Sequence, residues 1–353
     1  MNFASDNNAG IHPHVLRAIE AANHGHAVAY GADTWTDRAR NRFREVFGDQ
    51  SEAFFVFNGT AANVLSLQSV VRSFHSVICG EYAHLASDEC GAPEKSLGAK
   101  LVLVPVTLGG KLTPERVLEA VKGAGDPHHS QARAVSITQS TEFGSVYSAN
   151  EIKALAEAAH SKGLILHMDG ARIANAAASL GVSLRAITAD CGVDVLSFGG
   201  TKNGLLLGEA VVFLNPSLVP DFQFLRKQGM QLASKMRFLA AQFEALFTDD
   251  LWLKNALQAN RMAKLLESRL RAIPLLEISR PVEANAVFAV MPDRLIPLLQ
   301  REYYFHVWAP APALAQDGPR SEARSEVRLM CSFNTEESHV LDFSEKAKRI
   351  FSE

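Results

Sequence analysis

Lys202 is the residue whose setting in the sequence most clearly suggests chemistry. It follows an apolar run and two glycines, from Val193 to Gly200, and a second apolar run begins soon after it. Lysine is rarely buried without a partner, so a lysine between two core strands needs a reason. An imine with a carbonyl cofactor is one, because desolvation lowers the amine pKa and makes the nitrogen nucleophilic near neutral pH. A lysine in a surface turn after a strand gives the same pattern.

Asp169 closes another apolar stretch, residues 164–168, and Arg172 follows three positions later. An acid at the carboxyl end of a strand lies where open α/β sheets bind their ligands. With a pyridine aldehyde as cofactor, this carboxylate would keep the ring nitrogen protonated, so that the ring can accept electrons from the substrate. An aspartate in this position is also a common helix N-cap, and the pattern alone allows both.

Gly59 and Thr60 stand where a third apolar stretch, residues 53–57, meets an amphipathic helix. A helix N-terminus with a glycine and a hydroxyl residue binds phosphate through its free backbone amides. Most such junctions are ordinary turns. The phosphate assignment therefore depends on the presence of Lys202 and Asp169 in the same chain.

The elements that position these residues alternate along the chain. Between about residues 50 and 215, short apolar runs alternate with amphipathic helical patterns, which predicts an α/β fold with a parallel sheet flanked by helices. Thr113 and Pro114 open one helix, and Asn150 is the expected N-cap of another that Gly163 closes. Seven strands are expected, at residues 53–57, 77–79, 101–104, 134–138, 164–168, 193–197 and 210–214.

The length of 353 residues exceeds what one hydrophobic core usually organises, so we expect two domains. After Pro216 the pattern is helical to about Ala272, and strands are expected at residues 287–290, 305–308 and 327–331. We therefore predict a large domain over residues 1–245 and a smaller α+β domain over residues 246–353. The stretch 309–325, rich in proline, alanine and charge, is predicted to be a mobile loop.

Composition and charge argue against several classes of partner. With 47% hydrophobic and 21% charged residues, the chain is typical of a globular protein. Its net charge of -3 gives no electrostatic reason to bind nucleic acid or an anionic membrane, so we expect small-molecule partners. The first residues and the lack of a long apolar stretch predict a cytoplasmic protein. Four scattered cysteines are expected to be reduced, and no metal site is predicted.

Lys202, Asp169 and the phosphate-type helix start, in this order, resemble the fold-type-I pyridoxal-phosphate (PLP) enzymes. The match narrows to the threonine aldolase family of the β-eliminating lyases, and it looks most like the low-specificity L-threonine aldolases of bacteria. It covers almost the whole chain, and the segments ending at Arg172 and Lys202 are specific in combination. The matching segments are Ser5-Asp6, Ala29-Tyr30-Gly31 with Asp33, 57–63, Ala83-His84 with 88–92, 167–172, 198–204, 231–237 and 328–331.

For the cofactor, the resemblance implies that Lys202 carries PLP as a Schiff base and that Asp169 contacts the pyridine nitrogen. The amides of Gly59, Thr60 and Ala61 would receive the phosphate, and His84 would stack on the ring. The family also has a lysine near the cofactor, here Lys227. The remaining residues implied to bind the cofactor are Arg172, Thr201 and Lys235, the last reaching the phosphate site from the next subunit.

For the substrate, the resemblance implies retro-aldol cleavage of L-threonine, L-allo-threonine and related β-hydroxy-α-amino acids to glycine and an aldehyde. The bond from Cα to Cβ must stand perpendicular to the conjugated plane, so the substrate carboxylate must be clamped. Arg328 matches the clamping arginine, with Ser5 and Arg172 as helpers. His84 and His128 match the histidines that would take the hydroxyl proton, although the neighbouring His129 leaves that alignment open and a held water could serve equally well.

Asp88 departs from the family pattern, in which an aromatic residue often stands four positions after the ring-stacking histidine. The choice among threonine, allo-threonine and a bulkier analogue such as phenylserine therefore stays open. Asp88 and Tyr30 complete the substrate-binding candidates. The resemblance also implies a homotetramer, a dimer of dimers with active sites at the dimer interface, where Tyr30 and Lys235 are the expected interface residues.

Two other functions remain compatible with the same residues. Another fold-type-I reaction, such as β-elimination, transamination or racemisation, would use the same lysine, aspartate and phosphate site. A PLP-fold protein that has lost catalysis could act as a binding module. The complete set of Lys202, Asp169, His84 and Arg328 argues against this second alternative.

Overall fold

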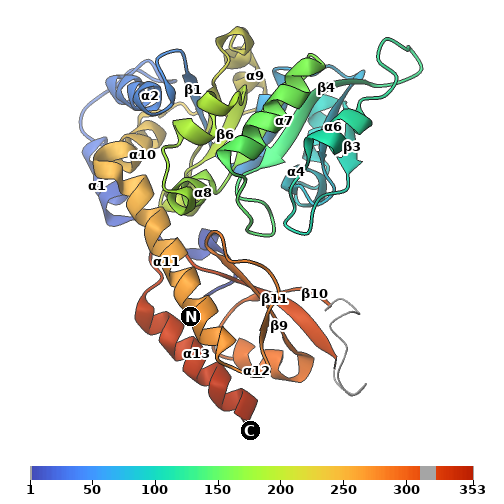
Figure 1. Cartoon of the computed structure of the whole chain (residues 1–353). Coiled ribbons are helices and arrows are strands. Elements are labelled where there is room, and N and C mark those ends of the chain that lie inside the picture. Colours follow the sequence, from blue (N-terminus) through green and yellow to red (C-terminus); the bar gives the residue numbers. More distant parts are fainter. Residues whose placement is uncertain (1, 311–322, 353) are drawn as a thin grey trace.

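The computed structural model describes residues 2–310 and 323–352 and has an α/β architecture (Figure 1). Its large sheet has the strand order β1-β7-β6-β5-β4-β2-β3. Strand β7 runs antiparallel to both of its neighbours, and the other neighbouring pairs are parallel. The predicted seven-stranded, mostly parallel sheet is confirmed. Its strands are β1 (Glu52–Val56), β2 (His75–Gly80), β3 (Lys100–Val104), β4 (Gln131–Thr138), β5 (Ile165–Gly170), β6 (Val195–Gly199) and β7 (Glu209–Phe213).

Helices cover both faces of this sheet because successive side chains of a strand point to opposite faces. In β2, Ile78 packs in the cluster on one face, whereas Val77 and Cys79 pack on the other. The first face is covered by α2 (Thr34–Phe47), α6 (Pro114–Ala120), α7 (Ala149–Ser161), α8 (Ile173–Leu180) and α10 (Arg237–Phe247). The second face is covered by α3 (Gly59–Gln68), α4 (His84–Ser87), α5 (Ala92–Leu97) and α9 (Phe222–Gln228).

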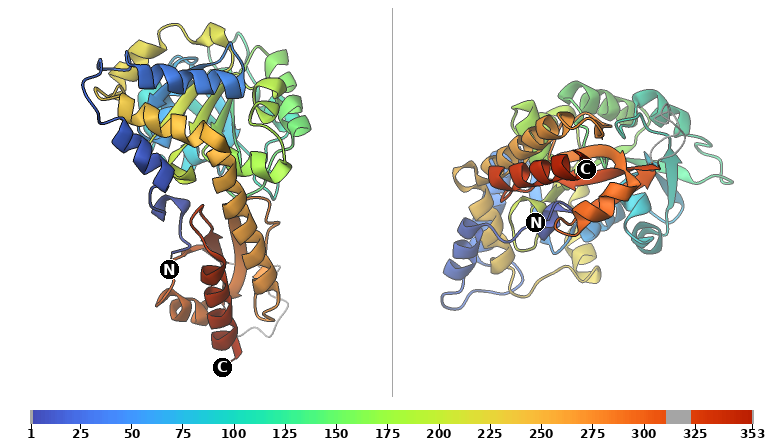
Figure 2. Two further views of the ribbon diagram at one scale, coloured as in Figure 1. Left: turned by 90° about the vertical axis from the view of Figure 1, so that its left-hand side faces the viewer. Right: turned by 90° about the horizontal axis from the view of Figure 1, so that it is seen from below.

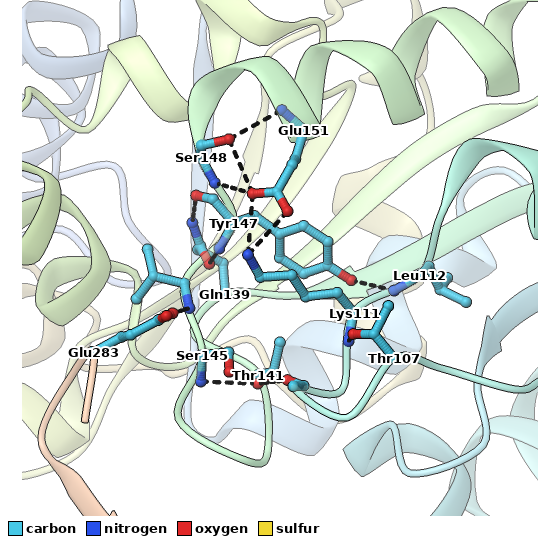
Figure 3. Close-up of polar contacts among 12 residues, drawn as sticks. Thr107, Lys111, Leu112, Gln139, Thr141, Ser145, Tyr147, Ser148, Glu151 and Glu283 are labelled. Carbon is cyan, nitrogen blue, oxygen red and sulfur yellow. Dashed lines mark hydrogen bonds and ion pairs between the residues drawn. The ribbon is translucent and has the colours of Figure 1, made fainter. Parts of the chain in front are cut away.

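Two of the predicted helix starts can be compared with the structure. Thr113 caps α6 as expected, with Pro114 in the first turn. The expected cap of α7 at Asn150 is wrong, because Ser148 caps this helix two residues earlier. Ser148 and Glu151 bond each other's backbone amides in a capping box, which satisfies two helix-end donors that a cap at Asn150 would leave open (Figure 3).

A second sheet lies below the first in Figure 1 and is antiparallel throughout, with the order β10-β11-β9-β8. It packs with α12 (Ile296–Gln300) and α13 (Glu337–Ser352) around a separate apolar cluster. The short strand β8 was not predicted. The strands are β8 (Glu277–Ile278), β9 (Ala286–Pro292), β10 (His306–Pro310) and β11 (Arg324–Met330).

One long helix, α11 (Leu251–Arg271), joins the two sheets (Figure 2). Its first residues, including Trp252, pack in the core of the large sheet, and its later residues, including Leu266, pack in that of the small one. The N-terminal segment also joins the small sheet: Phe3 exchanges backbone hydrogen bonds with Tyr304 and Met330. The boundary at residue 245 stays a prediction. The loop predicted at 309–325 falls mostly on residues 311–322, which lie outside the described residues.

Two expectations on composition can be checked directly. All four cysteines are free thiols, as expected. Within residues 2–310 and 323–352, no helix combines the length and the apolar character that crossing a membrane requires. The first α-helix, α1 (Pro13–Ala21), follows a 3-10 turn at Asp6–Asn8 and lies beside α10 in Figure 1.

Candidate active site

A cavity of about 250 Å³ lies at the carboxyl ends of the parallel strands. Its wall brings together Lys202, Asp169, His84, Gly59 and Thr60, which come from four separate segments of the chain. A larger groove of about 470 Å³ beside β3 and α6 contains none of the sequence-predicted site residues. The geometry of an open α/β sheet therefore selects the smaller cavity as the functional one.

Lys202 lies in a single turn of 3-10 helix, Thr201–Asn203, directly after β6. Lys202 lines the cavity, so the alternative of a lysine in a surface turn is not supported. Burial lowers the pKa of Lys202, and the charge of Arg172 lowers it further, whereas Asp6, Asp169 and Glu209 act in the opposite direction. A less protonated amine is a better nucleophile, which suits a lysine that attacks a carbonyl carbon.

Asp169 is the last residue but one of β5 and is buried. One carboxylate oxygen accepts a hydrogen bond from the Ala171 amide (2.9 Å), and the other accepts one from Asn63 Nδ2 (2.8 Å). The helix that follows, α8, has Arg172 as its cap, so the N-cap alternative for Asp169 is wrong. The carboxylate is held from both sides and lines the cavity.

Gly59 and Thr60 begin α3 and line the cavity. A Cβ atom added to Gly59 would meet no heavy atom within 4 Å, so the chain itself leaves open space there. The Ala61 amide, also predicted to receive the phosphate, donates to the side chain of Asn58, the cap of the helix (2.9 Å), so its role stays a prediction. Within the described part of the chain, the Gly59 and Thr60 amides have no such partner.

His84 begins α4 and lines the same cavity. Its backbone amide donates to Glu142 Oε1 (2.9 Å), and its ring Nδ1 lies 3.0 Å from Glu89 Oε1. The hydrogen bond with Glu89 raises the pKa of His84, burial lowers it, and the net shift is upward. The histidine is therefore fixed by two carboxylates that come from different segments.

The loop that carries Glu142 is held in place by a polar network (Figure 3). Tyr147 Oη accepts a hydrogen bond from the Leu112 amide (2.6 Å), and the Gln139 side chain bonds both the amide and the carbonyl of Tyr147. Glu142 Oε1 also accepts a hydrogen bond from Thr138 Oγ1 (2.8 Å), and burial raises the pKa of Glu142. The loop therefore holds Glu142 where its Oε1 accepts the hydrogen bond from the His84 amide.

Arg172 lies beside the cavity in a bidentate pair with Asp6: Nε is 2.7 Å from Oδ2 and Nη2 is 2.8 Å from Oδ1. Asn285 donates to the same carboxylate (3.0 Å). Although burial raises the pKa of Asp6, the ion pair with Arg172 brings it below its usual value. The pair therefore commits two donors of Arg172, which limits what that side chain can offer to a ligand.

Arg328 lies on β11, with its guanidinium 4.7 Å from the centre of the Trp308 ring. Its Nη2 donates a long hydrogen bond (3.4 Å) to the carbonyl of Ala4, next to Ser5. Its Nε is buried and has no hydrogen-bond partner among the described residues. Burial and the nearby Arg172 lower the pKa of Arg328 to about 10. A half-buried cation with no carboxylate partner among the described residues is suited to bind an anion from outside.

Several other predicted residues do not reach this cavity within one chain. Tyr30 is exposed, and the centre of its ring lies 5.2 Å from Lys227 Nζ. Its backbone amide donates to the carbonyl of Ser234, next to Lys235. These three residues form a separate group, so the expected place of Lys227 near the cofactor is not supported. Asp88 is exposed directly after α4, and its negative charge raises the pKa of Arg328 slightly against the larger lowering effects.

His128 does not reach this cavity within one chain, and its predicted catalytic role stays a prediction. It is exposed in the loop before β4, where its amide bonds Asp126. The cavity lies at the opposite, carboxyl end of the strands, and β4 spans Gln131–Thr138. A strand of that length separates its two ends by roughly 25 Å, beyond the reach of a histidine side chain.

The structure also brings in residues that sequence reasoning missed. Asn63 and Glu89 were quoted only as parts of matching segments, as was Asp6, yet all three are buried and bond site residues. Glu209 lines the cavity beside Thr201, accepts a hydrogen bond from the Gly200 amide (2.8 Å), and has its pKa raised to about 7 by burial. A buried acid in an apolar run was the available signal for Glu209.

Comparisons with known proteins agree with this geometry. The family model for β-eliminating lyases matches residues 2–294. The chain is 45% identical over 351 residues to the low specificity L-threonine aldolase of Pseudomonas sp. (strain NCIMB 10558), covering 99% of this chain and 98% of that protein. It is 44% identical over 350 residues to the corresponding enzyme of Pseudomonas aeruginosa, with 99% and 97% covered. The solved structure of Leishmania major threonine aldolase superposes with a TM-score of 0.91 at 29% identity, covering 99% of both chains.

Proposed function

This chain belongs to the β-eliminating lyase family, and we propose that it is a PLP-dependent aldolase that cleaves L-threonine and L-allo-threonine to glycine and acetaldehyde. The observation that carries the proposal is one cavity that unites Lys202, Asp169 and His84, with Arg328 on the adjoining sheet, whose Nε has no hydrogen-bond partner among the described residues. The low-specificity threonine aldolases it resembles set the substrate class.

The residues of the cavity fit PLP. Lys202 Nζ would bond the aldehyde carbon, and the buried carboxylate of Asp169 would pair with the ring nitrogen. The free amides of Gly59 and Thr60, beside the open space at Gly59, would hold the phosphate. When bound, PLP supplies the electron sink that makes the bond from Cα to Cβ cleavable.

The same residues explain why no metal is assigned. Ligand-type atoms of His84, Glu89 and Asp169 lie within 4.8 Å of one another, which is a spacing that could hold a cation. Asn63 Nδ2 instead donates to both carboxylates, at 2.9 and 2.8 Å. The Asn63 amide hydrogens point to the carboxylate oxygens that a cation would need as ligands. We therefore assign these side chains to the cofactor and substrate site and not to a metal site.

For the substrate, we propose that Arg328 binds the α-carboxylate and that Ser5 assists it. The guanidinium lies over the Trp308 ring at 4.7 Å from its centre, which helps to hold it in place before the substrate binds. His84 would accept the proton of the β-hydroxyl directly or through a held water, since its ring reaches the cavity. Arg172, paired with Asp6, lowers the pKa of Lys202 by its charge.

The reaction type is tested by its products. Incubation with L-threonine is expected to release acetaldehyde and glycine in equal amounts, measured by an alcohol dehydrogenase coupled assay and by amino-acid analysis. Formation of ammonia and 2-oxobutanoate would instead support β-elimination, and transfer of the amino group or loss of optical activity would support the other fold-type-I reactions. Phenylserine in a parallel assay for benzaldehyde tests whether the cavity accepts an aromatic β-substituent.

Arg328→Lys is expected to raise KM for L-threonine and lower kcat/KM by about 10- to 100-fold, the usual loss for one or two charged hydrogen bonds. A lysine keeps the charge but loses the planar, two-pronged donor set that a carboxylate prefers. Steady-state kinetics measure this change. Arg301→Lys, an exposed site after α12, serves as the control and should leave both constants unchanged. An unaltered KM in Arg328→Lys would remove Arg328 from the carboxylate site.

We further propose a cytoplasmic homotetramer whose active sites lie at a dimer interface. Exposed apolar side chains support an interface: Tyr30, Val28, Phe224 and Met230 are each at least half exposed. Lys235 lies close by in the chain segment that contacts Tyr30. Association of copies would cover this apolar surface, which a monomer would leave in water.

A further inference from the structure

Glu89 is a buried carboxylate that the proposed reaction does not yet use. Its side chain has no exposed surface. Oε1 lies 3.0 Å from His84 Nδ1 and 2.9 Å from Asn63 Nδ2, and Oε2 has no hydrogen-bond partner within the described residues. Burying a carboxylate with so few hydrogen-bond donors costs folding free energy, so its position beside the His84 imidazole needs a reason.

The backbone has an unusual conformation directly after Glu89. Cys90 and Gly91 both adopt left-handed conformations, with φ of 52° and 70°. The chain therefore reverses directly after Glu89, and the side chain returns to the ring five residues earlier. A non-glycine residue in this region is uncommon, so the turn is a specific feature of the segment.

The hydrogen bond decides which ring nitrogen of His84 carries a proton. An ionised carboxylate only accepts, so His84 Nδ1 must donate to it, and in the neutral ring Nε2 then keeps its lone pair. Nε2 has no hydrogen-bond partner in the part of the chain that the structure describes, the His84 side chain is 41% exposed, and His84 lines the cavity. The free acceptor is thus available to a ligand.

We propose that Glu89 is a positioning residue that holds His84 as the Nδ1-protonated tautomer, so that Nε2 can take the β-hydroxyl proton of the substrate. The proposal rests on the proposed aldolase function. Asn63 takes part, because its single amide nitrogen bonds both Glu89 and Asp169 and so keeps the Glu89 carboxylate turned to the ring.

The charges around His84 act in the same direction. Glu89 and Asp169 face the ring and raise the pKa of His84, whereas burial and the charge of Lys202 lower it. Glu142 contacts only its backbone amide. Removing the Glu89 charge should therefore lower the pKa of His84 and weaken it as a base.

The direct test is NMR of the cofactor-free protein labelled at the histidine ring nitrogens, with His84→Asn used to identify the signal among the twelve histidines. We expect the Nδ1-protonated tautomer in the unaltered protein. In Glu89→Gln, which keeps the shape and removes the charge, we expect a lower His84 pKa and a mixed or reversed tautomer. Glu94→Gln, an exposed site in α5, is the matched control and should change neither.

Kinetics with L-threonine provide the second readout. In Glu89→Gln we expect kcat/KM to fall by about 100-fold, mostly through kcat, with the acid limb of its pH profile at lower pH. Glu89→Asp, which retains the charge, should recover part of this loss.

Two results would overturn the inference: an Nε2-protonated His84 in the unaltered protein, or a folded Glu89→Gln variant with unchanged tautomer, pKa and kcat/KM. If Glu89→Gln does not fold, the tautomer of the unaltered protein still decides. The NMR experiment needs neither cofactor nor substrate. If His84 shows the expected tautomer but the protein does not cleave threonine, only the proposed function is refuted. Cleavage that does not depend on Glu89 would refute the inference alone.

Discussion

Replacing Lys202 by alanine is expected to lower kcat for L-threonine by about 10⁴-fold or more, the scale seen when an enzyme loses its covalent nucleophile. The side chain lines the cavity between β6 and the helix turn, and no other lysine lines that cavity. Burial and Arg172 lower its pKa, which prepares the amine for attack on the aldehyde carbon. No other described residue of the cavity wall carries an amine that could replace it.

A spectroscopic readout accompanies this loss. The unaltered protein should have a visible absorption band with PLP that borohydride abolishes, and Lys202→Ala should lack it. Lys162→Ala, an exposed site after α7, is the control and should keep both the band and the activity. A borohydride-sensitive band that persists in Lys202→Ala, or no such band in the unaltered protein, would support a non-catalytic binding module.

The second large effect is expected from Asp169→Asn. Asparagine keeps the size of the side chain and can still accept the hydrogen bond from Asn63, but it removes the negative charge. Without that charge the ring nitrogen of the cofactor loses the partner that keeps it protonated, so kcat should fall by about 10²- to 10³-fold. KM should change less, because the α-carboxylate of the substrate is proposed to bind Arg328 and not Asp169.

Rapid kinetics and thermal unfolding together measure this second effect. Unfolding of Asp169→Asn should remain cooperative at a somewhat lower temperature, since the single amide oxygen of asparagine can accept only one of the two hydrogen bonds that Asp169 accepts. Asp190→Asn removes the same charge from an exposed ion pair with Arg185 and is the matched control. A kcat for Asp169→Asn within a factor of three of the unaltered value would exclude Asp169 as the partner of the ring nitrogen.

The large sheet and the places of Lys202, Asp169 and Gly59 could be predicted from the sequence. Strands buried on both faces appear as short apolar runs, and the residue after each run lies at the carboxyl edge of a parallel sheet. Lys202, Asp169 and Thr60 follow such runs, so their convergence is a consequence of local pattern and strand direction. The helix starts at Thr113 and Gly59 are equally local, because a cap bonds amides within the same turn.

Contacts between distant segments required the tertiary structure. Asp6 and Arg172 pair across 166 positions, and Asn63 bonds Asp169 across 106. Glu142 bonds the His84 amide across 58 positions. His128 matched a motif but lies at the amino edge of the sheet.

The sheet, and the lysine, acid and helix start that form the cavity, therefore follow from the amino-acid sequence, because periodicity and strand direction are local properties of the chain. Tertiary structure alone decided which buried polar side chains pair. A buried donor or acceptor bonds whatever partner packing brings within about 3 Å, and that partner is not encoded by its neighbours along the chain. The hydrogen bonds of His84, Asp169 and Arg172, on which the proposed mechanism depends, belong to this second class.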